Sequence, residues 1–366
     1  MLYRAWADAV IVSQIYFAVG VLSLMTVLSI PTLTRYLPRR WTHSLGIAFY
    51  LLAAIIGMIG GKLIALALLF TSLGTAISFV CYNANMLDYV AKSDLARLES
   101  LRLFYAGAGW AIGPFLGVWL LGFWSGAPFV LVGLAASTVL VMIWMIGMGS
   151  TTLKSPSGTV SPNPMLYLRR FAAQPRLVAG WWLAVLRSCG WAVYLVYVGI
   201  FAIQSGLSER IGGIAASLAS TGLFLAPLML RGIQRYSLRA AVRTGFLMSG
   251  SCFLLAGMVS GWPWLSIALL LLGAYFLILL DVCGGLPFLM SVKPSERTEM
   301  SAVYSTFRDV ANILTPGIVW LVLQLAPLSI VFAAAGLGLL AAWMIAGSLH
   351  PQLGVPSAER TRVSPK

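Results

Sequence analysis

Eleven long apolar runs divide this chain, and they constrain its fold more than any other feature. A helix needs about 20 apolar residues to cross a hydrocarbon layer of about 30 Å. Gly and Pro are scattered through the runs without the two-residue alternation of a lipid-facing barrel strand, so the sequence predicts an all-α integral membrane protein with about 11 transmembrane helices. The runs lie at residues 9–34, 44–60, 62–85, 101–122, 128–148, 177–203, 210–230, 244–260, 264–289, 302–324 and 328–348.

The balance of apolar and charged residues excludes a water-soluble fold. Hydrophobic residues make up 60% of the chain and charged residues only 9%, whereas a soluble domain carries about 25% charged residues. So few charges could not cover a surface in water, and the lipid bilayer is therefore the expected surroundings of the protein.

The position of the basic residues explains the formal net charge of +14. All but five of the 24 Lys and Arg residues fall in alternate connections between the runs, and the exceptions are Arg4, Lys62, Arg187, Arg210 and Arg308. Short cytoplasmic loops concentrate Lys and Arg, so these connections are predicted to be cytoplasmic. The charge therefore indicates membrane topology, and no nucleic-acid partner is expected.

Two segments repeat at a nearly fixed offset. Segment 30–39 matches segment 226–235, 196 residues later, and in both a Pro is followed by Arg four and eight residues on. The surroundings of Pro114 correspond to those of Pro316, 202 residues later, which predicts two parallel repeats. The predicted parts are an N-terminal helix bundle at 1–148, a cytoplasmic linker at 149–176, a C-terminal six-helix bundle at 177–348 and a cytoplasmic tail at 349–366.

The same offset predicts that the first repeat lacks its first helix. The counterpart of the run at 177–203 would lie almost entirely before Met1, and eleven spans with a cytoplasmic C-terminus would place the N-terminus outside. Residues 1–8 contain no cleavable signal peptide. Two alternatives remain: a real outward N-terminus, or a start upstream of Met1. We favour the second, because the repeat and the topology require the same helix.

The cysteines and histidines give no sign of a cofactor. Cys81, Cys189, Cys252 and Cys283 lie singly within apolar runs, with no C-x-x-C spacing, and are expected to be buried packing residues. Both histidines lie in predicted loops. We therefore expect neither a metal nor another cofactor.

Two parallel helix bundles joined by a basic central loop resemble the major facilitator superfamily of secondary transporters, over about residues 9–348. The sharpest match is Gly109 to Gly117, Gly-Trp-Ala-Ile-Gly-Pro-Phe-Leu-Gly. It resembles the G-x-x-x-G-P-x-x-G-G motif on the fifth helix of the proton-coupled exporters, with Val118 in place of the final Gly. The resemblance implies a two-bundle fold and transport of a small molecule by alternating access.

The same segment has a physical interpretation of its own. Gly109, Gly113 and Gly117 recur every four residues on one helix face, which lets a neighbour approach closely, and Pro114 removes one backbone hydrogen bond. A smooth, bendable face suits helices that rock against each other. Ordinary close packing is the alternative.

A second family motif, G-x-L-a-D-r-x-G-r-r, is matched only in part by segment 31–40. Leu33, Arg39 and Arg40 agree, but Arg35 occupies the Asp position and Pro replaces both glycines. Arg35, Arg39 and Arg40 are assigned a conformational role, whereas the acidic gate of the family is not carried over.

Charged residues inside apolar runs are candidates for function, because each costs about 2.5–3.5 kcal/mol to insert. Arg187 lies about ten residues, or roughly 15 Å, into its run, near the bilayer midplane. Trp191 and Tyr194 follow at i+4 and i+7 on the same face. In one interpretation this stripe binds an anionic or hydrogen-bonding substrate. In the other, Arg187 pairs with a helix carbonyl or a carboxylate and serves architecture.

A second group of candidates lies near the last cytoplasmic loop, which centres near residue 295. Asp281 and Arg308 lie at matching depth on either side of it, so an ion pair is geometrically available. Asp281 and Asp309 are competing candidates for proton coupling, because an Arg partner changes the proton affinity of a carboxylate. Arg308 and Asn312 share a face and are candidate substrate contacts. A fixed salt bridge is the alternative.

Asn83 and Gln14 are weaker candidates for substrate contact in the first half. The leading hypothesis is a monomeric secondary active transporter that exports a small organic molecule against protons. An importer of a sugar or organic anion and a non-transporting membrane sensor or scaffold are alternatives. The basic loops offer no catalytic cluster and no phosphate-binding loop, so an enzyme is not expected. The expected location is a cell membrane, with the bacterial inner membrane as first choice.

Overall fold

The chain forms two compact helical units in its computed structural model. The structure describes residues 1–89, 95–147, 169–225, 228–229, 238–283, 304 and 306–347. The units are Met1–Thr159 and Val160–Lys366, and each is treated by itself below. Their boundary falls inside the segment predicted as a linker. The described residues contain helices and no β-strand, which confirms the predicted all-α fold.

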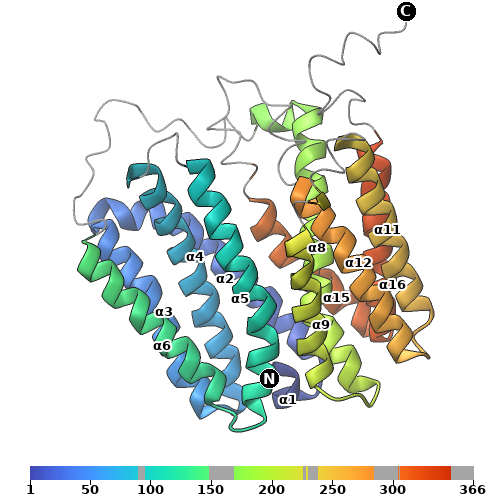
Figure 1. Cartoon of the computed structure of the whole chain (residues 1–366), viewed down its shortest axis with the longest axis horizontal. Helices are drawn as coiled ribbons and strands as arrows, with labels where there is room; N and C mark the ends of the chain where they lie inside the picture. The colour runs from blue at the N-terminus through green and yellow to red at the C-terminus, as the bar shows by residue number, and fades with distance from the viewer. Residues whose placement is uncertain are drawn as a thin grey trace, which may run out of the picture. The chain divides into compact units, whose positions relative to one another are not determined.

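In the first unit, α3 packs against both α4 and α6 (Figure 1). Helix α2 packs against α4, and α5 packs against α6. The elements are α1 (Leu2–Trp6), α2 (Ala9–Tyr36), α3 (Arg39–Ile59), the short 3-10 helix η1 (Gly61–Leu63), α4 (Ile64–Tyr89), α5 (Leu95–Leu121) and α6 (Ala127–Ile146).

In the second unit, α8 is the central helix. It packs against α9, α12, α15 and α16, while α11 packs against α12 and α16. The elements are α8 (Pro175–Gln204), α9 (Arg210–Thr221), the 3-10 helix η2 (Gly222–Leu225), α11 (Leu238–Met258), α12 (Pro263–Cys283), α15 (Phe307–Leu325) and α16 (Leu328–Ala346). Because α8 carries Arg187, this residue lies on the helix with the most partners.

Each of the eleven apolar runs coincides with a described helix. Eight helices in the described part of the chain are long and apolar enough to cross a membrane. Two shorter apolar stretches, Tyr105–Leu121 in α5 and Arg210–Leu225 across α9 and η2, correspond to two further runs. The remaining run, 302–324, corresponds to α15, which carries the charged residues Arg308 and Asp309 in its first turn.

Three helices extend further towards the N-terminus than the apolar runs that mark them. Helix α3 begins at Arg39 where the run begins at 44, and the described parts of α5 and α11 reach back to Leu95 and Leu238, where the runs begin at 101 and 244. Hydropathy marks the stretch that suits lipid, but a helix continues past it, because hydrogen bonding within the helix does not require apolar side chains. Basic residues that the sequence places in loops therefore lie in first helical turns.

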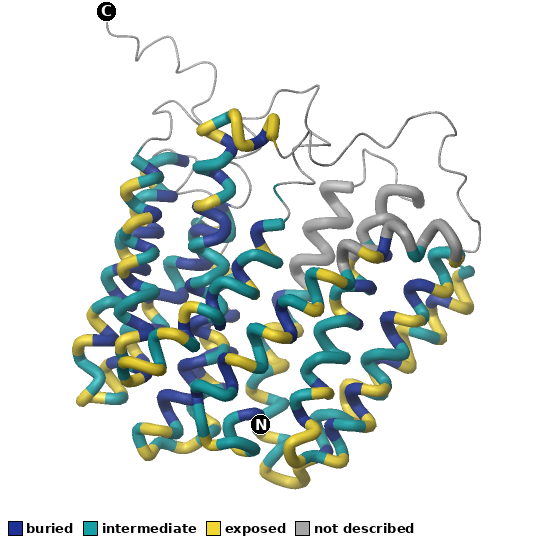
Figure 2. The backbone as a smooth tube through the Cα atoms, turned by 180° about the vertical axis from the view of Figure 1, so that it is seen from behind, coloured by how far each residue is buried: buried dark blue, intermediate teal, exposed yellow. Residues whose placement is uncertain are grey.

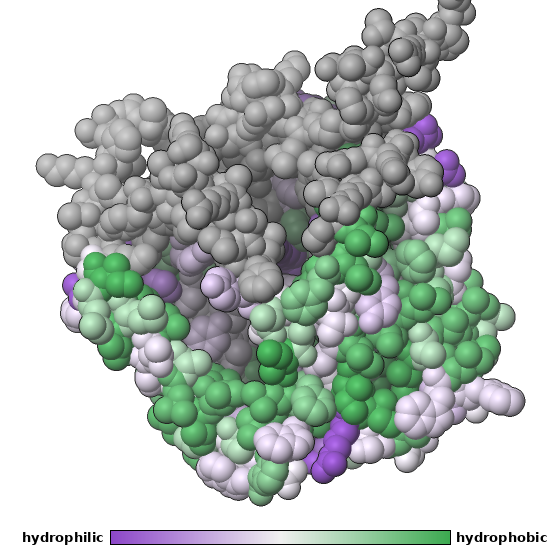
Figure 3. Space-filling model, viewed as in Figure 1, coloured by the Kyte–Doolittle hydropathy of each residue, from purple (hydrophilic) through white to green (hydrophobic). Residues whose placement is uncertain are grey.

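Apolar side chains remain on the outer faces of the helices, as lipid contact requires. Leu255 and Met258 on α11 and Leu272 on α12 are exposed, and this surface of the second unit is mostly hydrophobic (Figure 3). Buried positions recur along the opposite faces of the same helices (Figure 2). The burial pattern therefore shows which faces pack against the unit and which suit lipid.

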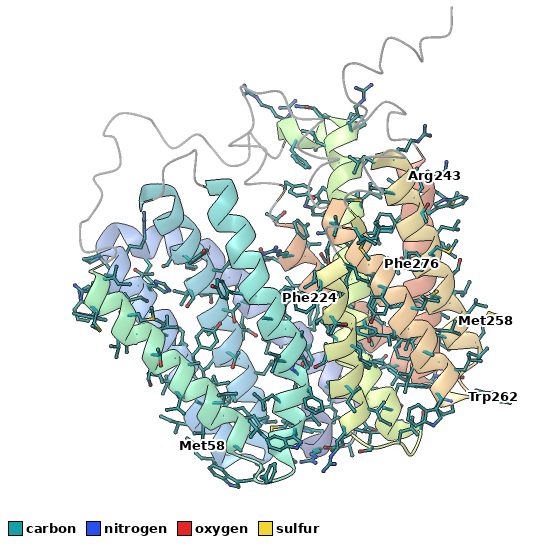
Figure 4. All side chains as sticks on the ribbon, in the orientation of Figure 1. Met58, Phe224, Arg243, Met258, Trp262 and Phe276 are labelled. Carbon is teal, nitrogen blue, oxygen red and sulfur yellow. The ribbon has the colours of Figure 1, made fainter. Side chains whose placement is uncertain are left out.

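Glycines allow α11 and α16 to approach closely. A Cβ atom on Gly336 would lie 2.5 Å from the Leu254 backbone nitrogen, and one on Gly257 would lie 2.7 Å from the Ser329 carbonyl oxygen. Neither clash can be relieved by turning a side chain, since the atoms met belong to the backbone. This packing holds the end of α11 that carries Met258, opposite the end that carries Arg243 (Figure 4).

Replacing Gly336 by Ala should therefore lower the stability of the protein by about 1–3 kcal/mol, the usual cost of overpacking. The thermal unfolding midpoint of the purified protein in detergent measures this. Gly113→Ala on α5 is the matched control, because its added Cβ meets no atom within 4 Å. Helix propensity should then raise stability by up to about 1 kcal/mol. Equal losses in the two variants would contradict the packing account.

Candidate functional site

An ion pair joins the middle of α8 to the end of α12. Arg187 Nε lies 3.1 Å from Asp281 Oδ1, although its N–H is not aligned for a hydrogen bond. Arg187 Nη1 donates to the Leu280 carbonyl oxygen at 3.3 Å. The Arg187 side chain is 12% exposed and that of Asp281 is 34% exposed. The pair therefore lies mostly inside the unit, with the carboxylate the more accessible partner.

Trp191 holds the second oxygen of the same carboxylate. Its indole Nε1 donates to Asp281 Oδ2 at 2.7 Å, one helical turn after Arg187. The sequence correctly places these two side chains on one face of α8, but it does not identify Asp281 as their shared partner. The loop argument compares only neighbouring helices, whereas α8 and α12 are separated along the chain by α9 and α11.

Tyr194, predicted as a substrate contact on the same face as Trp191, is covered by a neighbouring helix. Its side chain is fully buried, and its hydroxyl donates to the Ala215 carbonyl oxygen of α9 at 2.7 Å. The Tyr194 and Trp191 ring centroids are 6.1 Å apart in an edge-on arrangement. Tyr194 is thus committed to packing between α8 and α9, and Trp191 marks the end of the accessible polar stripe.

Helix α15 brings a third charged element to this region. The Phe307 ring lies 5.6 Å from the Arg187 guanidinium carbon and 5.6 Å from that of Arg308, within the range of a cation–π contact. Trp181 of α8 also donates to Thr306 just before α15, at 3.2 Å. These contacts fix the start of α15 beside the Arg187 pair.

The predicted partner of Asp281 was Arg308, but the ion pair at 3.1 Å is with Arg187. The positive charge of Arg308 also acts on Asp281. Asp309 lies in the first turn of α15, where the helix dipole favours a carboxylate. Arg308 and Asn312 share an exposed face as predicted, whereas Thr315 on the next turn is buried.

The first unit contains the remaining predicted substrate contacts. Gln14 is exposed on α2, next to the fully buried Ser13. Asn83 lies in α4 and Arg35 in α2, but their side chains lie outside the described part of the structure. The roles of all three remain predictions.

The glycine face of α5 meets no close neighbour in the described part of its own unit. A Cβ atom built on Gly109, Gly113 or Gly117 would meet no described atom within 4 Å, and Pro114 lies inside the helix. The conformational role of these glycines remains a prediction, with ordinary close packing as its alternative.

Arg39 and Arg40 lie in the first turn of α3 and not in a loop. Arg40 Nη2 donates to the Trp144 carbonyl oxygen in the last turn of α6 at 2.9 Å, and its guanidinium carbon lies 3.7 Å from the centre of the Trp144 ring. Trp144 Nε1 in turn donates to Ser44 at 3.1 Å. Arg40 therefore ties α3 to the C-terminal end of α6, where the helix dipole favours a cation.

The second unit has an equivalent contact that the sequence analysis did not identify. Arg239 of α11 donates to the Gly347 carbonyl oxygen just after α16, and the Arg243 guanidinium carbon lies 5.1 Å from the centre of the Trp343 ring. Trp144 and Trp343 are 199 residues apart, close to the repeat offset. A comparison of the tryptophans at that offset could have found the pair.

The described residues contain no group of three His, Cys, Asp or Glu side chains that could hold a metal ion. The four cysteines are free, and three of them, Cys81, Cys252 and Cys283, are buried. On α8, α12 and α15 the described side chains form one ion pair, with further charged residues and aromatic rings beside it.

A family model described as the Major Facilitator Superfamily matches residues 7–316 of the chain. No curated protein matches the chain in sequence. Many solved structures are similar to it, and three of them are named here. The nucleoside transporter NupG has a TM-score of 0.64 and 11% sequence identity, and the match covers 94% of this chain and 91% of that chain. A POT family transporter in complex with a thioalcohol conjugated peptide has a TM-score of 0.71 and 14% identity, and the match covers 94% of this chain and 88% of that chain. A bacterial homologue of the iron transporter ferroportin, in an inward-facing state, has a TM-score of 0.62 and 19% identity, and the match covers 93% of this chain and 90% of that chain. Identities this low show a shared fold and do not carry over a substrate.

The pair geometry makes Arg187 and Asp281 energetically dependent on each other. Asp281→Leu should lower the free energy of unfolding by about 2 kcal/mol, less than the roughly 3–5 kcal/mol of a fully buried pair because the carboxylate is partly exposed. Adding Arg187→Met should recover most of this loss, since no unpaired charge then remains. Thermal unfolding of the wild type, Asp281→Leu, Arg187→Met and the double variant forms a double-mutant cycle. Losses that simply add would argue against a coupled pair.

Proposed function

The chain belongs to the Major Facilitator Superfamily of transporters, and on this basis we propose that it exports a small organic molecule by proton-coupled alternating access. The proposal assigns proton coupling to the Arg187–Asp281–Trp191 cluster. Its main support is that both oxygens of one partly accessible carboxylate are held by groups on another helix.

This arrangement suits a group that gains and loses a proton. A charged Asp281 is stabilised by the Arg187 guanidinium and the Trp191 N–H, whereas a neutral Asp281 loses most of its attraction for Arg187. Protonation therefore weakens the link between α8 and α12. A change of charge is converted into a change of helix contact, as coupling of proton and substrate requires.

Asp309 remains the second candidate for the proton site. The observation that favours Asp281 is its direct contact with two side chains of α8, the central helix of the unit. Asp309 lies in the first turn of its own helix, so its charge has a local structural explanation. We therefore assign the proton to Asp281.

Export as the direction of transport is supported by α5. Its Gly109 to Gly117 segment resembles the exporter motif, and three glycines on one helix face form a smooth surface that suits a helix moving against it. Import of an organic anion is a second candidate, favoured by the presence of Arg187 at the cluster. The monomeric state and a bacterial inner membrane remain predictions.

Proteoliposomes that contain the purified protein and an internal pH-sensitive dye test the proposal. Addition of a transported compound should change the internal pH in wild-type vesicles, and a panel of metabolites and lipophilic compounds serves to find one. Asp281→Asn should retain flux but lose its dependence on the proton gradient. Glu209→Gln, at the start of α9 and outside the cluster, is the control carboxylate.

The alternatives give different outcomes in the same assay. If Asp309→Asn loses the dependence of flux on the proton gradient while Asp281→Asn keeps it, the proton site is Asp309 and not Asp281. Accumulation inside the vesicles when protons flow inward would favour import. Absence of gradient-dependent flux for the whole panel would support a sensor or scaffold and reject the proposed transport.

A further inference from the structure

The Arg187 guanidinium makes few of the contacts that it could make. Arginine has five N–H donors in a rigid fork. Among the described residues only Nη1 donates a hydrogen bond, to the Leu280 carbonyl oxygen at a long 3.3 Å. Nε lies near Asp281 without the alignment of a hydrogen bond. The pair is therefore not the two-point fork that Arg and a carboxylate form at their best.

The charges around Asp281 determine what could use the spare donors. Arg187 faces it from α8, Arg308 and Asp309 come from α15, and Cys283 follows on α12 itself, with Tyr304 just before α15. With two Arg and two Asp, this group is neutral as a whole. When Asp281 takes up a proton, the group gains one uncompensated positive charge, which in a low-dielectric environment favours a bound anion.

One aromatic ring lies near the same guanidinium, and a second contacts its carboxylate partner. Phe307 lies 5.6 Å from the Arg187 guanidinium carbon, and Trp191 donates to the Asp281 oxygen that Arg187 does not face. A planar substrate could contact these rings while its charged group reaches the guanidinium. The surroundings thus combine one cationic fork with apolar, ring-shaped contacts, as is typical of small-molecule sites.

We infer that the transported substrate is an organic anion, whose carboxylate binds the terminal amino groups of Arg187 in place of Asp281. The inference rests on the proposed proton coupling at Asp281 and adds the substrate class of its site. Because proton and anion then bind together and move in the same direction, it favours the import candidate over export. The substrate carboxylate and Asp281 compete for one guanidinium, so neutralisation of Asp281 promotes binding of the anion. Proton and anion therefore bind cooperatively at this cluster.

Binding of benzoate to the full-length protein in neutral detergent tests the inference. Benzoate combines a carboxylate with a planar ring, while benzamide is its neutral analogue and benzylamine its cationic one. Equilibrium dialysis with labelled compounds measures the affinities. Benzoate should bind, and Asp281→Asn should tighten its binding about tenfold, the effect of removing one competing charged hydrogen-bond partner.

Two further variants separate a specific site from general electrostatics. Asp309→Asn removes the same charge from α15 and should change benzoate affinity less than Asp281→Asn does. Arg187→Lys keeps the charge but loses the fork, so it should weaken benzoate binding about tenfold. The elution profile in size-exclusion chromatography confirms that each variant is folded.

Three results would overturn the anion site. One is tighter binding of benzylamine than of benzoate, another is equal tightening in the Asp281→Asn and Asp309→Asn variants, and the third is absence of benzoate binding to folded Asp281→Asn at millimolar concentration. Proton-dependent flux of a neutral or cationic compound alone in proteoliposomes would reject the anion and retain the transporter.

Discussion

Hydrocarbon offers no hydrogen-bond partner to a peptide group, and this constraint determines every described element of the protein. Each segment satisfies its own backbone as a helix, and only the helix ends are left with free carbonyl groups. Arg40 reaches such a carbonyl at Trp144, and Arg239 reaches one at Gly347. Basic residues at the start of α3 and α11 therefore complete the ends of α6 and α16.

The same environment makes every buried charge depend on a partner. Arg187 on α8 and Asp281 on α12 meet this requirement together, and Trp191 adds a hydrogen bond from a ring that is otherwise apolar. Because α8 also packs against α9, α15 and α16, a change in this pair acts on the helix that contacts most of the unit. The electrostatic centre and the packing centre of the second unit lie on the same helix.

The sequence predicted the fold well because hydropathy reports directly on lipid contact, and the helix face shared by Arg187 and Trp191 follows from the period of the helix. Contacts between helices far apart in sequence were not predictable in this way. Asp281 was matched to Arg308 across one loop, whereas its partner at 3.1 Å is Arg187. Tyr194 lies on the predicted side of α8, but α9 covers it, and sequence periodicity carries no information about which neighbour covers a face.

Stability alone does not account for the geometry of the Arg187 pair. Buried ion pairs add little net stability even at their best, since desolvation offsets the attraction. In this pair the Nε–H of Arg187 is not aligned with Asp281, and among the described residues the guanidinium uses few of its donors. Tyr194, one turn beyond Trp191 on the same helix, shows what a purely structural polar group looks like, because it is fully buried and makes a 2.7 Å hydrogen bond. A guanidinium kept beside an accessible carboxylate is instead suited to exchanging one anionic partner for another, and the coupling that we propose for this cluster consists of such an exchange.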